Sequence, residues 1–303
     1  MFEPPAQSVV DIRKNNTTIT HGTQIQYQNP SQYYGRRETQ VHKLSTRLYV
    51  QPPSVTIDGY SYGAGNGMRT YTQHNYLRPG ISSSLKTQHF EHALQLTKEH
   101  FHKCNVIDFG CADGPFLPSL SEHFTKVVGI DRSPEFLGVA SGVISQLPHK
   151  NVRLMCNASL TIPDLKTALE YEQYHILYLL EVVEHVGDRS DPWNSRANFV
   201  ATLFQLLDPG GYIVLSVPVM TGVPFLLQRL GLAVLRQSRE PISRVELLKA
   251  GLLNNTSHLE RQWCGGHLGF NHRKLTDCLQ RRFRIVASHS TLFQVVKVFQ
   301  KLR

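Results

Sequence analysis

The sequence predicts an α/β protein with a doubly wound, mostly parallel sheet of seven strands and an antiparallel hairpin at the sheet edge. Three observations predict this fold. From about residue 81 onward, short apolar runs alternate with longer helical stretches, which is typical of parallel β-α units. A glycine-bearing turn joins the first apolar run to the next helix. The last two runs follow one another too closely to leave room for a helix between them.

Length and composition limit the class of protein. The chain has 303 residues, enough for one large domain or for a domain with extensions. Hydrophobic content of 41% and charged content of 18% indicate a globular protein, and no apolar run is long enough to span a membrane. Residues 1–10 lack the pattern of a signal peptide, and the five cysteines form no C-x-x-C pair. We therefore expect a cytoplasmic protein with reduced thiols and no cysteine zinc site.

The net charge of +9 is unevenly distributed along the chain. Residues 1–90 carry nine Lys/Arg and four Asp/Glu, and residues 261–303 carry nine and one. Residues 91–221 carry nine and fifteen, so an acidic middle lies between basic ends. Basic ends can attract nucleic acid, an anionic membrane or a phosphorylated substrate, or they can simply be solvated faces that keep the protein in solution.

Residues 1–80 form a polar extension rich in tyrosine, which we expect to be partly disordered, most of all towards its start. Eight of the twelve tyrosines precede residue 77, and glycines cluster in DGYSYGAGNGMRTY. The tyrosines can stack on bases or sugars, anchor the extension on the flank of the domain, or form a small lid.

The domain itself is predicted over residues 81–303. It opens with a helix in SSLKTQHFEHALQLTKEHFHK, for which Ser82 to Ser84 offer an N-cap. The predicted strands are VIDF, VVGI, VRLM, ILYLL, YIVLSV, FRIVAS and FQVVKVF. The helices between them lie near 115–124, 134–147, 163–171, 197–207 and 272–281, and one more begins at EVVEHV.

An insertion of about 219–266 separates the fifth strand from the last helix. It opens with VPFLLQRLGLAVLRQSR, a helix with an apolar face and three arginines. The apolar face comprises Leu226, Leu227, Leu230, Val234 and Leu235, and the arginines are Arg229, Arg236 and Arg239. Residues 223–239 can therefore contact a membrane surface peripherally, or the insertion can be a lid packed over the active site.

The turn after the first strand is the first candidate binding site. In the segment Asp108-Phe-Gly110-Cys-Ala112-Asp-Gly114, small residues recur at every second position, so the backbone can approach a ligand and then start a helix. The spacing is neither that of a dinucleotide fingerprint nor that of a phosphate loop. Asp131 ends the next strand, where a carboxylate can accept both hydroxyls of a ribose. A nucleoside-like ligand is the expected occupant.

The pattern Asp-x-Gly-x-(Gly/Ala)-x-Gly, followed by Gly-Ile-Asp about twenty residues later, resembles the class I S-adenosylmethionine-dependent methyltransferases. The segment LLDPGGYIVLSVP adds a second mark of that family, since Leu-x-Pro-Gly-Gly precedes its fifth strand. The resemblance covers about residues 85–300 and implies a Rossmann-like methyltransferase fold. It also implies that the chain is an enzyme that uses S-adenosyl-L-methionine as cofactor.

The resemblance assigns cofactor-binding roles by position. Gly110, Ala112 and Gly114 would line the methionine part, Asp108 would orient its amino group, and Asp131 would hold the ribose. Ala112 stands where glycine is commoner, and Asn157 stands where many members have an aspartate near the adenine. The expected cofactor-binding residues are Asp108, Gly110, Ala112, Gly114, Asp131, Asn157, Ala158 and Glu181.

The segment LLEVVEHV carries the candidate chemistry. Glu181, Glu184 and His185 are spaced i, i+3 and i+4, so a helix beginning here would put them on one side. Two carboxylates and an imidazole suit a divalent metal such as Mg²⁺, Mn²⁺ or Zn²⁺, and His267 or His272 could complete the site. Alternatively, Glu181 contacts the substrate while Glu184 and His185 only cap the helix or bridge to neighbours. If no metal binds, His185 or His267 is the candidate general base.

Glu-x-x-Glu-His resembles two groups of this family, the ubiquinone-biosynthesis O-methyltransferases and the small-RNA 2′-O-methyltransferases. The first group is the nearer one and implies metal-assisted O-methylation of a small organic or lipid-like acceptor. Its predicted catalytic residues are His185, Glu184 and His267. RNA 2′-O-methylation is the alternative, favoured by the basic ends and disfavoured by the acidic middle. A cofactor-binding scaffold or regulatory protein without catalysis is the third hypothesis.

Overall fold

The computed structural model describes residues 47–55, 62, 70–170, 172–234, 242–261 and 266–301. All described residues belong to one compact unit, which falls within Thr46–Arg303. The disorder predicted towards the start of the extension lies outside the described residues.

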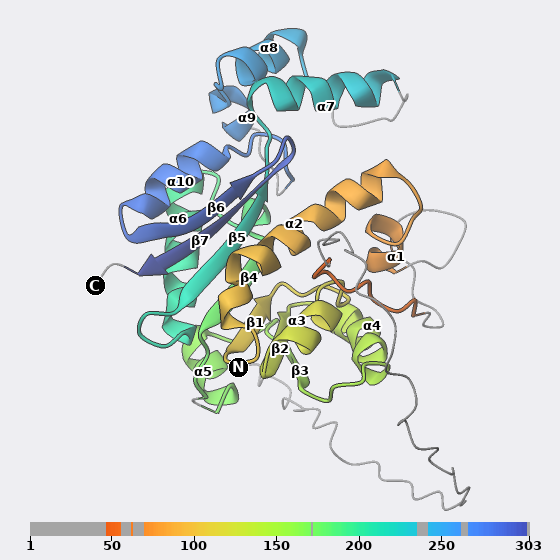
Figure 1. Ribbon diagram of the computed structural model, residues 1–303. Coiled ribbons are helices and arrows are strands. Elements are labelled where there is room, and N and C mark those ends of the chain that lie inside the picture. The colour runs from red at the N-terminus through yellow and green to blue at the C-terminus, as the bar shows by residue number, and fades with distance from the viewer. Residues whose placement is uncertain are drawn as a thin grey trace, which may run out of the picture. The chain divides into compact units, whose positions relative to one another are not determined.

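One seven-stranded sheet forms the centre of this compact unit, in the order β3-β2-β1-β4-β5-β7-β6 (Figure 1). The first five strands are parallel, and β7 runs antiparallel to both β5 and β6. The predicted sheet with an antiparallel edge hairpin is confirmed. The strands are β1 (Asn105–Phe109), β2 (Lys126–Asp131), β3 (Val152–Cys156), β4 (Ile176–Leu180), β5 (Tyr212–Pro218), β6 (Phe283–Ser290) and β7 (Gln294–Lys301).

Helices cover both faces of the sheet. One face packs against α2, α3 and α4, and the other against α5, α6 and α10. The helices are α1 (Tyr71–Asn75), α2 (Ile81–Thr97), α3 (Leu117–His123), α4 (Pro134–Ser145), α5 (Ile162–Ala168), α6 (Pro192–Leu203), α7 (Gly222–Val234), α8 (Arg244–Leu252), α9 (Ser257–Arg261) and α10 (His272–Gln280). Short 3₁₀ turns are η1 (Lys98–His100), η2 (Val183–His185) and η3 (Phe204–Leu206).

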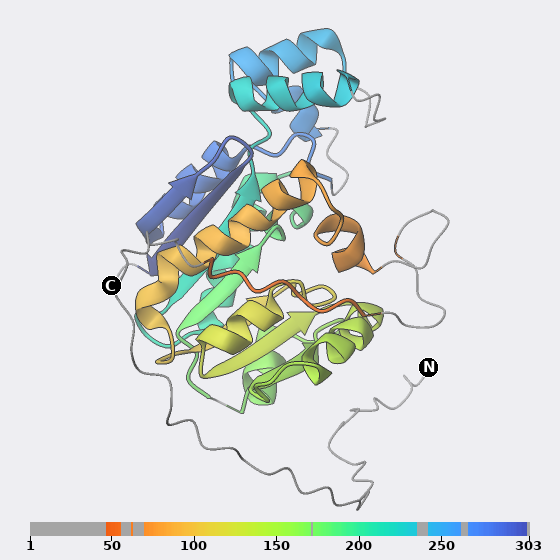
Figure 2. The same cartoon turned by 45° about the vertical axis from the view of Figure 1, so that its right-hand side comes forward.

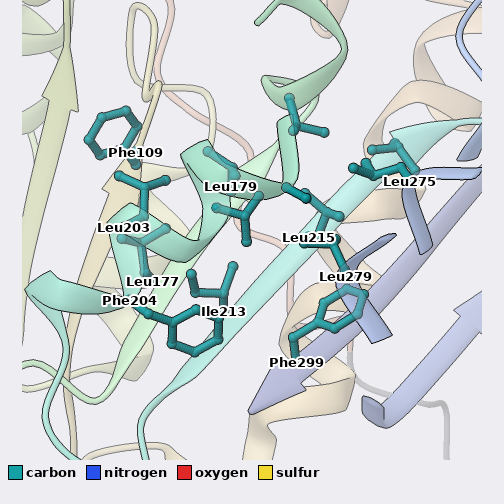
Figure 3. Packing of buried hydrophobic residues seen from close by; sticks show 14 of the residues in the cluster. Phe109, Leu177, Leu179, Leu203, Phe204, Ile213, Leu215, Leu275, Leu279 and Phe299 are labelled. Carbon is teal, nitrogen blue, oxygen red and sulfur yellow. The ribbon is translucent and has the colours of Figure 1, made fainter. Parts of the chain in front are cut away.

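Burial on both faces explains why the central strands read as continuous apolar runs. All five residues of β4, ILYLL, are buried. Alternate residues of β4 point to opposite faces, so Leu177 and Leu179 pack with α6 while Ile176 and Tyr178 pack with α2 and α3. Figure 3 shows the first of these two layers, with Leu203, Leu275 and Leu279 from the helices.

Two local predictions are wrong. Helix α2 begins at Ile81 with Gly80 as its N-cap, so the serines lie inside the first turn and do not cap it. No α-helix begins at EVVEHV, because Glu181 has a left-handed backbone (φ 56°) and only the 3₁₀ turn η2 follows. The α-helical spacing assumed for Glu181, Glu184 and His185 therefore does not apply.

Part of the predicted extension is packed into the domain. Tyr49 is 5% exposed, stacks on Phe90 of α2 with ring centroids 5.2 Å apart, and donates a hydrogen bond to the carbonyl oxygen of Pro115 (3.2 Å). In α1, the backbone N–H of Thr72 donates to Asp113 (2.8 Å), which is fully buried. Tyr49 and Thr72 of the predicted extension are therefore held against residues of the predicted domain.

The predicted insertion consists of α7, α8 and α9, which extend beyond the end of β5 (Figures 1 and 2). Helices α7 and α8 pack together, since a Cβ added to Gly251 would lie 2.2 Å from Cγ of Leu226. Leu235, Arg236 and Arg239 of the predicted amphipathic helix lie outside the described residues. In the described part of the chain, every helix is too short or too polar to cross a bilayer.

Replacing Tyr49 tests how far the extension supports the domain. We expect Tyr49→Ala to lower the free energy of unfolding by about 3 kcal/mol through the lost ring packing. The melting temperature measured by circular dichroism should then fall by roughly 5–10 °C. Tyr49→Phe, which removes only the bond to Pro115, should cost about 1 kcal/mol. An unchanged melting temperature for Tyr49→Ala would mean that the extension does not contribute to the core.

Candidate active site

A cavity of about 560 Å³ lies where the parallel strands end. In doubly wound sheets, ligands bind at the carboxyl ends of the strands. The lining residues lie at or just after the carboxyl ends of β1, β2, β3 and β4, or come from the segment before α2, from α2 itself, from the start of α4 and from α6. They include Tyr62, Tyr71, Tyr76, Phe90, Asp108, Gly110, Ala112, Phe116, Asp131, Asn157, Glu181 and His185.

The turn after β1 is fixed to the neighbouring strand. The backbone N–H groups of Gly110 and Cys111 both donate to the carbonyl oxygen of Ile130, at 2.7 and 3.0 Å. Gly110 has φ 82°, and a Cβ there would lie 2.4 Å from a methyl carbon of Val182. Only glycine fits this position, because a side chain would be strained and would also clash with the turn after β4.

Asp131 links the end of β2 to the glycine turn. Its Oδ2 accepts from the backbone N–H of Ala112 (2.8 Å), and its Oδ1 accepts from that of Ser133 (2.9 Å). Ala112 has φ 47°, a left-handed backbone conformation that costs more free energy for alanine than for glycine. The hydrogen bond to Asp131 helps to stabilise this conformation. Each carboxylate oxygen keeps a further lone pair, with which it could accept a ribose hydroxyl.

Two polar atoms of the cavity wall are buried and have no hydrogen-bond partner in the described part of the chain. They are Oδ2 of Asp108 and Oδ1 of Asn157. Both are acceptors, so they suit a ligand that brings an ammonium group and an amino group to these positions. Burial raises the pKa of Asp108 to about 8, and the charge of Asp131 adds to the shift. Ala158, which was also predicted to bind the cofactor, is exposed and does not line the cavity.

The segment after β4 brings together three of the predicted chemical groups. Oε1 of Glu184 lies 3.9 Å from Nε2 of His185 and 3.6 Å from Nδ1 of His267. Candidate ligand atoms of the three side chains all lie within 4.8 Å of one another. The two imidazole rings are nearly perpendicular, with centroids 4.8 Å apart. His272 lies elsewhere, in the first turn of α10, where burial lowers its pKa to about 4.

Glu184 is an unusual carboxylate because it is fully buried and neither of its oxygens has a hydrogen-bond partner among the described residues. Burial raises its pKa, and the charge of Glu181 raises it further. Burial also raises the pKa of Glu181, whose Oε1 accepts a hydrogen bond from Ser216 (2.6 Å) that opposes the shift. Two such carboxyls side by side favour the binding of a cation or a shared proton.

A buried arginine hydrogen-bonds to the backbone of the 3₁₀ turn η2. Arg196 of α6 is 1% exposed and donates to the backbone carbonyls of Val186 (2.9 Å) and Glu184 (3.3 Å). Its guanidinium lies over the rings of Trp193 and Phe270. Arg196 therefore fixes the backbone of η2, on which the orientation of Glu184 and His185 depends.

Sequence reasoning missed several residues of the site. Tyr62, Tyr71 and Tyr76 line the cavity although they precede the predicted domain. Their only sequence signal was the enrichment of tyrosine before residue 77, which left several roles open. Arg196 and Ser216 gave no signal, because nothing in a helix or a strand marks the residue that reaches a neighbouring turn.

A larger groove of about 960 Å³ lies at the opposite end of β5, near Asp208, Gly210 and Arg284. It adjoins the amino end of a parallel strand, where sheets of this kind do not bind their ligands. It also contains none of the predicted site residues. The smaller cavity is therefore the candidate active site.

The sheet order, the glycine turn and the acidic residue that ends β2 together define a class I S-adenosylmethionine-dependent methyltransferase. The chain belongs to the family described as "Methyltransferase domain", whose model matches residues 81–261. This match covers more than half of the chain, so the predicted family and the predicted enzyme class are confirmed.

Individual relatives are distant. The ubiquinone biosynthesis O-methyltransferase of Burkholderia thailandensis is 29% identical over 117 residues, which are 39% of this chain and 45% of that protein. A probable S-adenosylmethionine-dependent methyltransferase of Mycolicibacterium smegmatis is 25% identical over 120 residues, 39% of this chain and 40% of its own. The chain thus matches less than half the length of these curated relatives.

Among solved structures, the N-methyltransferase NodS from Bradyrhizobium japonicum WM9 in complex with S-adenosyl-L-homocysteine is similar in fold. It is 14% identical, with a TM-score of 0.46, over 77% of this chain and 97% of that one.

Asp131→Asn tests the ribose assignment. The amide keeps the shape but loses the charge and one acceptor, so we expect S-adenosylmethionine to bind about 100-fold more weakly by calorimetry. Glu135→Gln, on the exposed start of α4, is the matched control and should bind normally. Near-normal affinity of Asp131→Asn would contradict the assignment.

Asp108→Asn tests the buried carboxyl. Its folded-state pKa of about 8 lies above the ordinary value of 3.8, so the folded protein keeps a proton that the unfolded chain releases. The wild-type free energy of unfolding should therefore fall as the pH rises from about 4 to about 8, by about 6 kcal/mol from this group. Asp108→Asn should lack that part of the decline in denaturant titrations without cofactor. An identical pH dependence of the free energy of unfolding in both proteins would refute the raised pKa of Asp108.

Proposed function

We propose that this methyltransferase transfers the methyl group of S-adenosylmethionine to an oxygen of a small organic or lipid-like acceptor. The observation that carries the proposal is the fully buried carboxylate of Glu184. It lies beside His185 and His267, and none of the described residues donates a hydrogen bond to it. Such a group is costly to bury unless it serves a ligand or a proton transfer.

On the cofactor side, the residues present fit S-adenosylmethionine. Asp131 would accept the ribose hydroxyls, Oδ1 of Asn157 the adenine amino group, and Asp108 the ammonium group of the methionine part. Gly110 and Gly114 would let that part approach the backbone. The bound cofactor supplies an electrophilic methyl group on a sulfonium.

On the acceptor side, the cavity wall is largely aromatic. Tyr71, Tyr76 and Phe90 line it together with Phe116, and burial raises the pKa of Tyr71 to about 12, so its hydroxyl stays neutral. Such a wall favours a flat or apolar acceptor over a strongly charged one. The protein's contribution is then to align the acceptor oxygen with the methyl group and to keep water away.

The oxygen must lose a proton before or during the transfer. His185 lines the cavity and is half exposed, so its imidazole is the candidate general base, with His267 beside it. Glu184 would orient these rings and stabilise the imidazolium that forms. Arg196 would hold the backbone of η2 in position through its hydrogen bonds to the carbonyls of Val186 and Glu184.

The same side chains fit a divalent cation. Glu184, His185 and His267 offer one carboxylate and two imidazoles within 4.8 Å, and Glu181 could add a second carboxylate. A cation held there would supply Lewis-acid polarisation of the acceptor oxygen. Its binding would also remove the cost of burying Glu184 without a partner.

Names of relatives support oxygen as the acceptor atom. Several are ubiquinone biosynthesis O-methyltransferases, although they align over less than half of their length, and a similar fold occurs in an N-methyltransferase. RNA 2′-hydroxyls are the alternative acceptor, so a screen for methyl acceptors should include both RNA and catechols.

Glu184→Gln and His267→Ala test the proposed chemistry. Both substitutions should reduce the rate of methyl transfer at least 100-fold. In calorimetric titrations of chelator-treated protein, both should abolish the binding of Mn²⁺ or Zn²⁺, while the affinity for S-adenosylmethionine stays unchanged. His258→Ala is the matched control, since His258 pairs with Glu246 in the insertion, outside the cavity.

The outcomes separate the hypotheses. Lost turnover without any metal binding in the wild type would leave the histidine base as the mechanism. Full activity of both variants would contradict the proposal, and cofactor binding without turnover of any acceptor would favour the scaffold hypothesis.

A further inference from the structure

The helix pair α7 and α8 carries an apolar face that no described part of the chain covers. Three residues of α7 and three of α8 are between 49% and 63% exposed. We call these six residues the outer face. They are Val223, Leu227, Leu230, Val245, Leu248 and Leu252.

The six residues point to one side of the helix pair. Phe225 of α7 and Ala250 of α8 are both fully buried and belong to the same core cluster. At about 100° per residue, the exposed positions of each helix lie opposite its own buried residue. The helices are in direct contact through Leu226 and Gly251, so the two exposed stripes form one continuous apolar surface.

Cationic side chains border this surface. Arg244 and Lys249 are exposed on α8 beside Val245 and Leu248. The acidic groups of the described insertion are engaged elsewhere. Glu246 caps α8 and pairs with His258, while Glu260 pairs with Lys274 (2.8 Å). The border of the outer face is therefore positive.

We propose that the outer face docks onto the surface of an anionic lipid bilayer. A helix that lies in a membrane interface needs apolar side chains bordered by arginine and lysine. The apolar side chains insert among the acyl chains, and the cationic side chains attract the lipid phosphates. A second copy of the chain suits this face less well, because a twofold contact would bring Arg244 and Lys249 close to their own copies.

Docking would act close to the candidate active site. The pair follows directly from the end of β5, and the chain returns from it through α9 to His267 (Figures 1 and 2). The helix pair extends beyond the carboxyl edge of the sheet, the edge at which the cavity opens. The proposal concerns the location of the protein and does not depend on which acceptor it methylates.

Co-sedimentation of the full chain with vesicles tests the proposal. Wild type should bind vesicles of phosphatidylcholine with roughly a third phosphatidylglycerol, and bind pure phosphatidylcholine at least tenfold more weakly. The double substitution L230E/L248E should lower the partition coefficient for anionic vesicles at least tenfold. Val286→Glu is the matched control, since Val286 is 41% exposed on edge strand β6 and should bind like wild type.

Other results would overturn the proposal. Wild type that ignores both vesicles, or L230E/L248E that binds like wild type, would contradict it. A wild-type dimer that L230E/L248E converts to a monomer, without vesicle binding, would assign the face to a second copy. Equal melting temperatures and equal S-adenosylmethionine affinity of all variants ensure that lost vesicle binding reflects the surface and not the fold.

Discussion

The connection between the ends of β1 and β2 determines the geometry of the whole site. The carbonyl oxygen of Ile130 accepts two N–H groups of the glycine turn, and the next residue, Asp131, accepts a third. These bonds hold Gly110 and Ala112 in conformations with positive φ, and they set the position of the helix that follows. Since the turn also contacts Val182 after β4, three strand ends are arranged around one small loop.

The site is electrostatically costly for the protein alone. Asp108, Glu181 and Glu184 are carboxyls whose burial raises their pKa, and Asp108 and Glu184 have oxygens without hydrogen-bond partners among the described residues. Arg196 is a buried cation whose charge partly offsets that of Glu184, and its own pKa is lowered by burial to about 10. Such an arrangement lowers stability in the empty protein and favours ligands that bring positive charge.

Most of the fold could be predicted from the sequence because it depends on local patterns. Runs such as ILYLL predict buried strands, and Gly-Ile-Asp marks the end of β2. The conformation of Glu181 could not be predicted, because a positive φ at a glutamate arises from tertiary contacts and not from helix propensity. The role of Tyr49 was hidden for a similar reason. Its partner Phe90 is about forty residues away, and the polar segment around Tyr49 has no periodicity.

The insertion is not an independent module. The chain leaves the sheet after β5, forms α7 to α9, and then supplies His267 to the group around Glu184. A graft that exchanged this segment between related enzymes, in order to alter where the enzyme works, would exchange one of the reactive side chains as well. Mutations selected for location and mutations selected for chemistry would therefore constrain each other, and the segment should evolve as a unit.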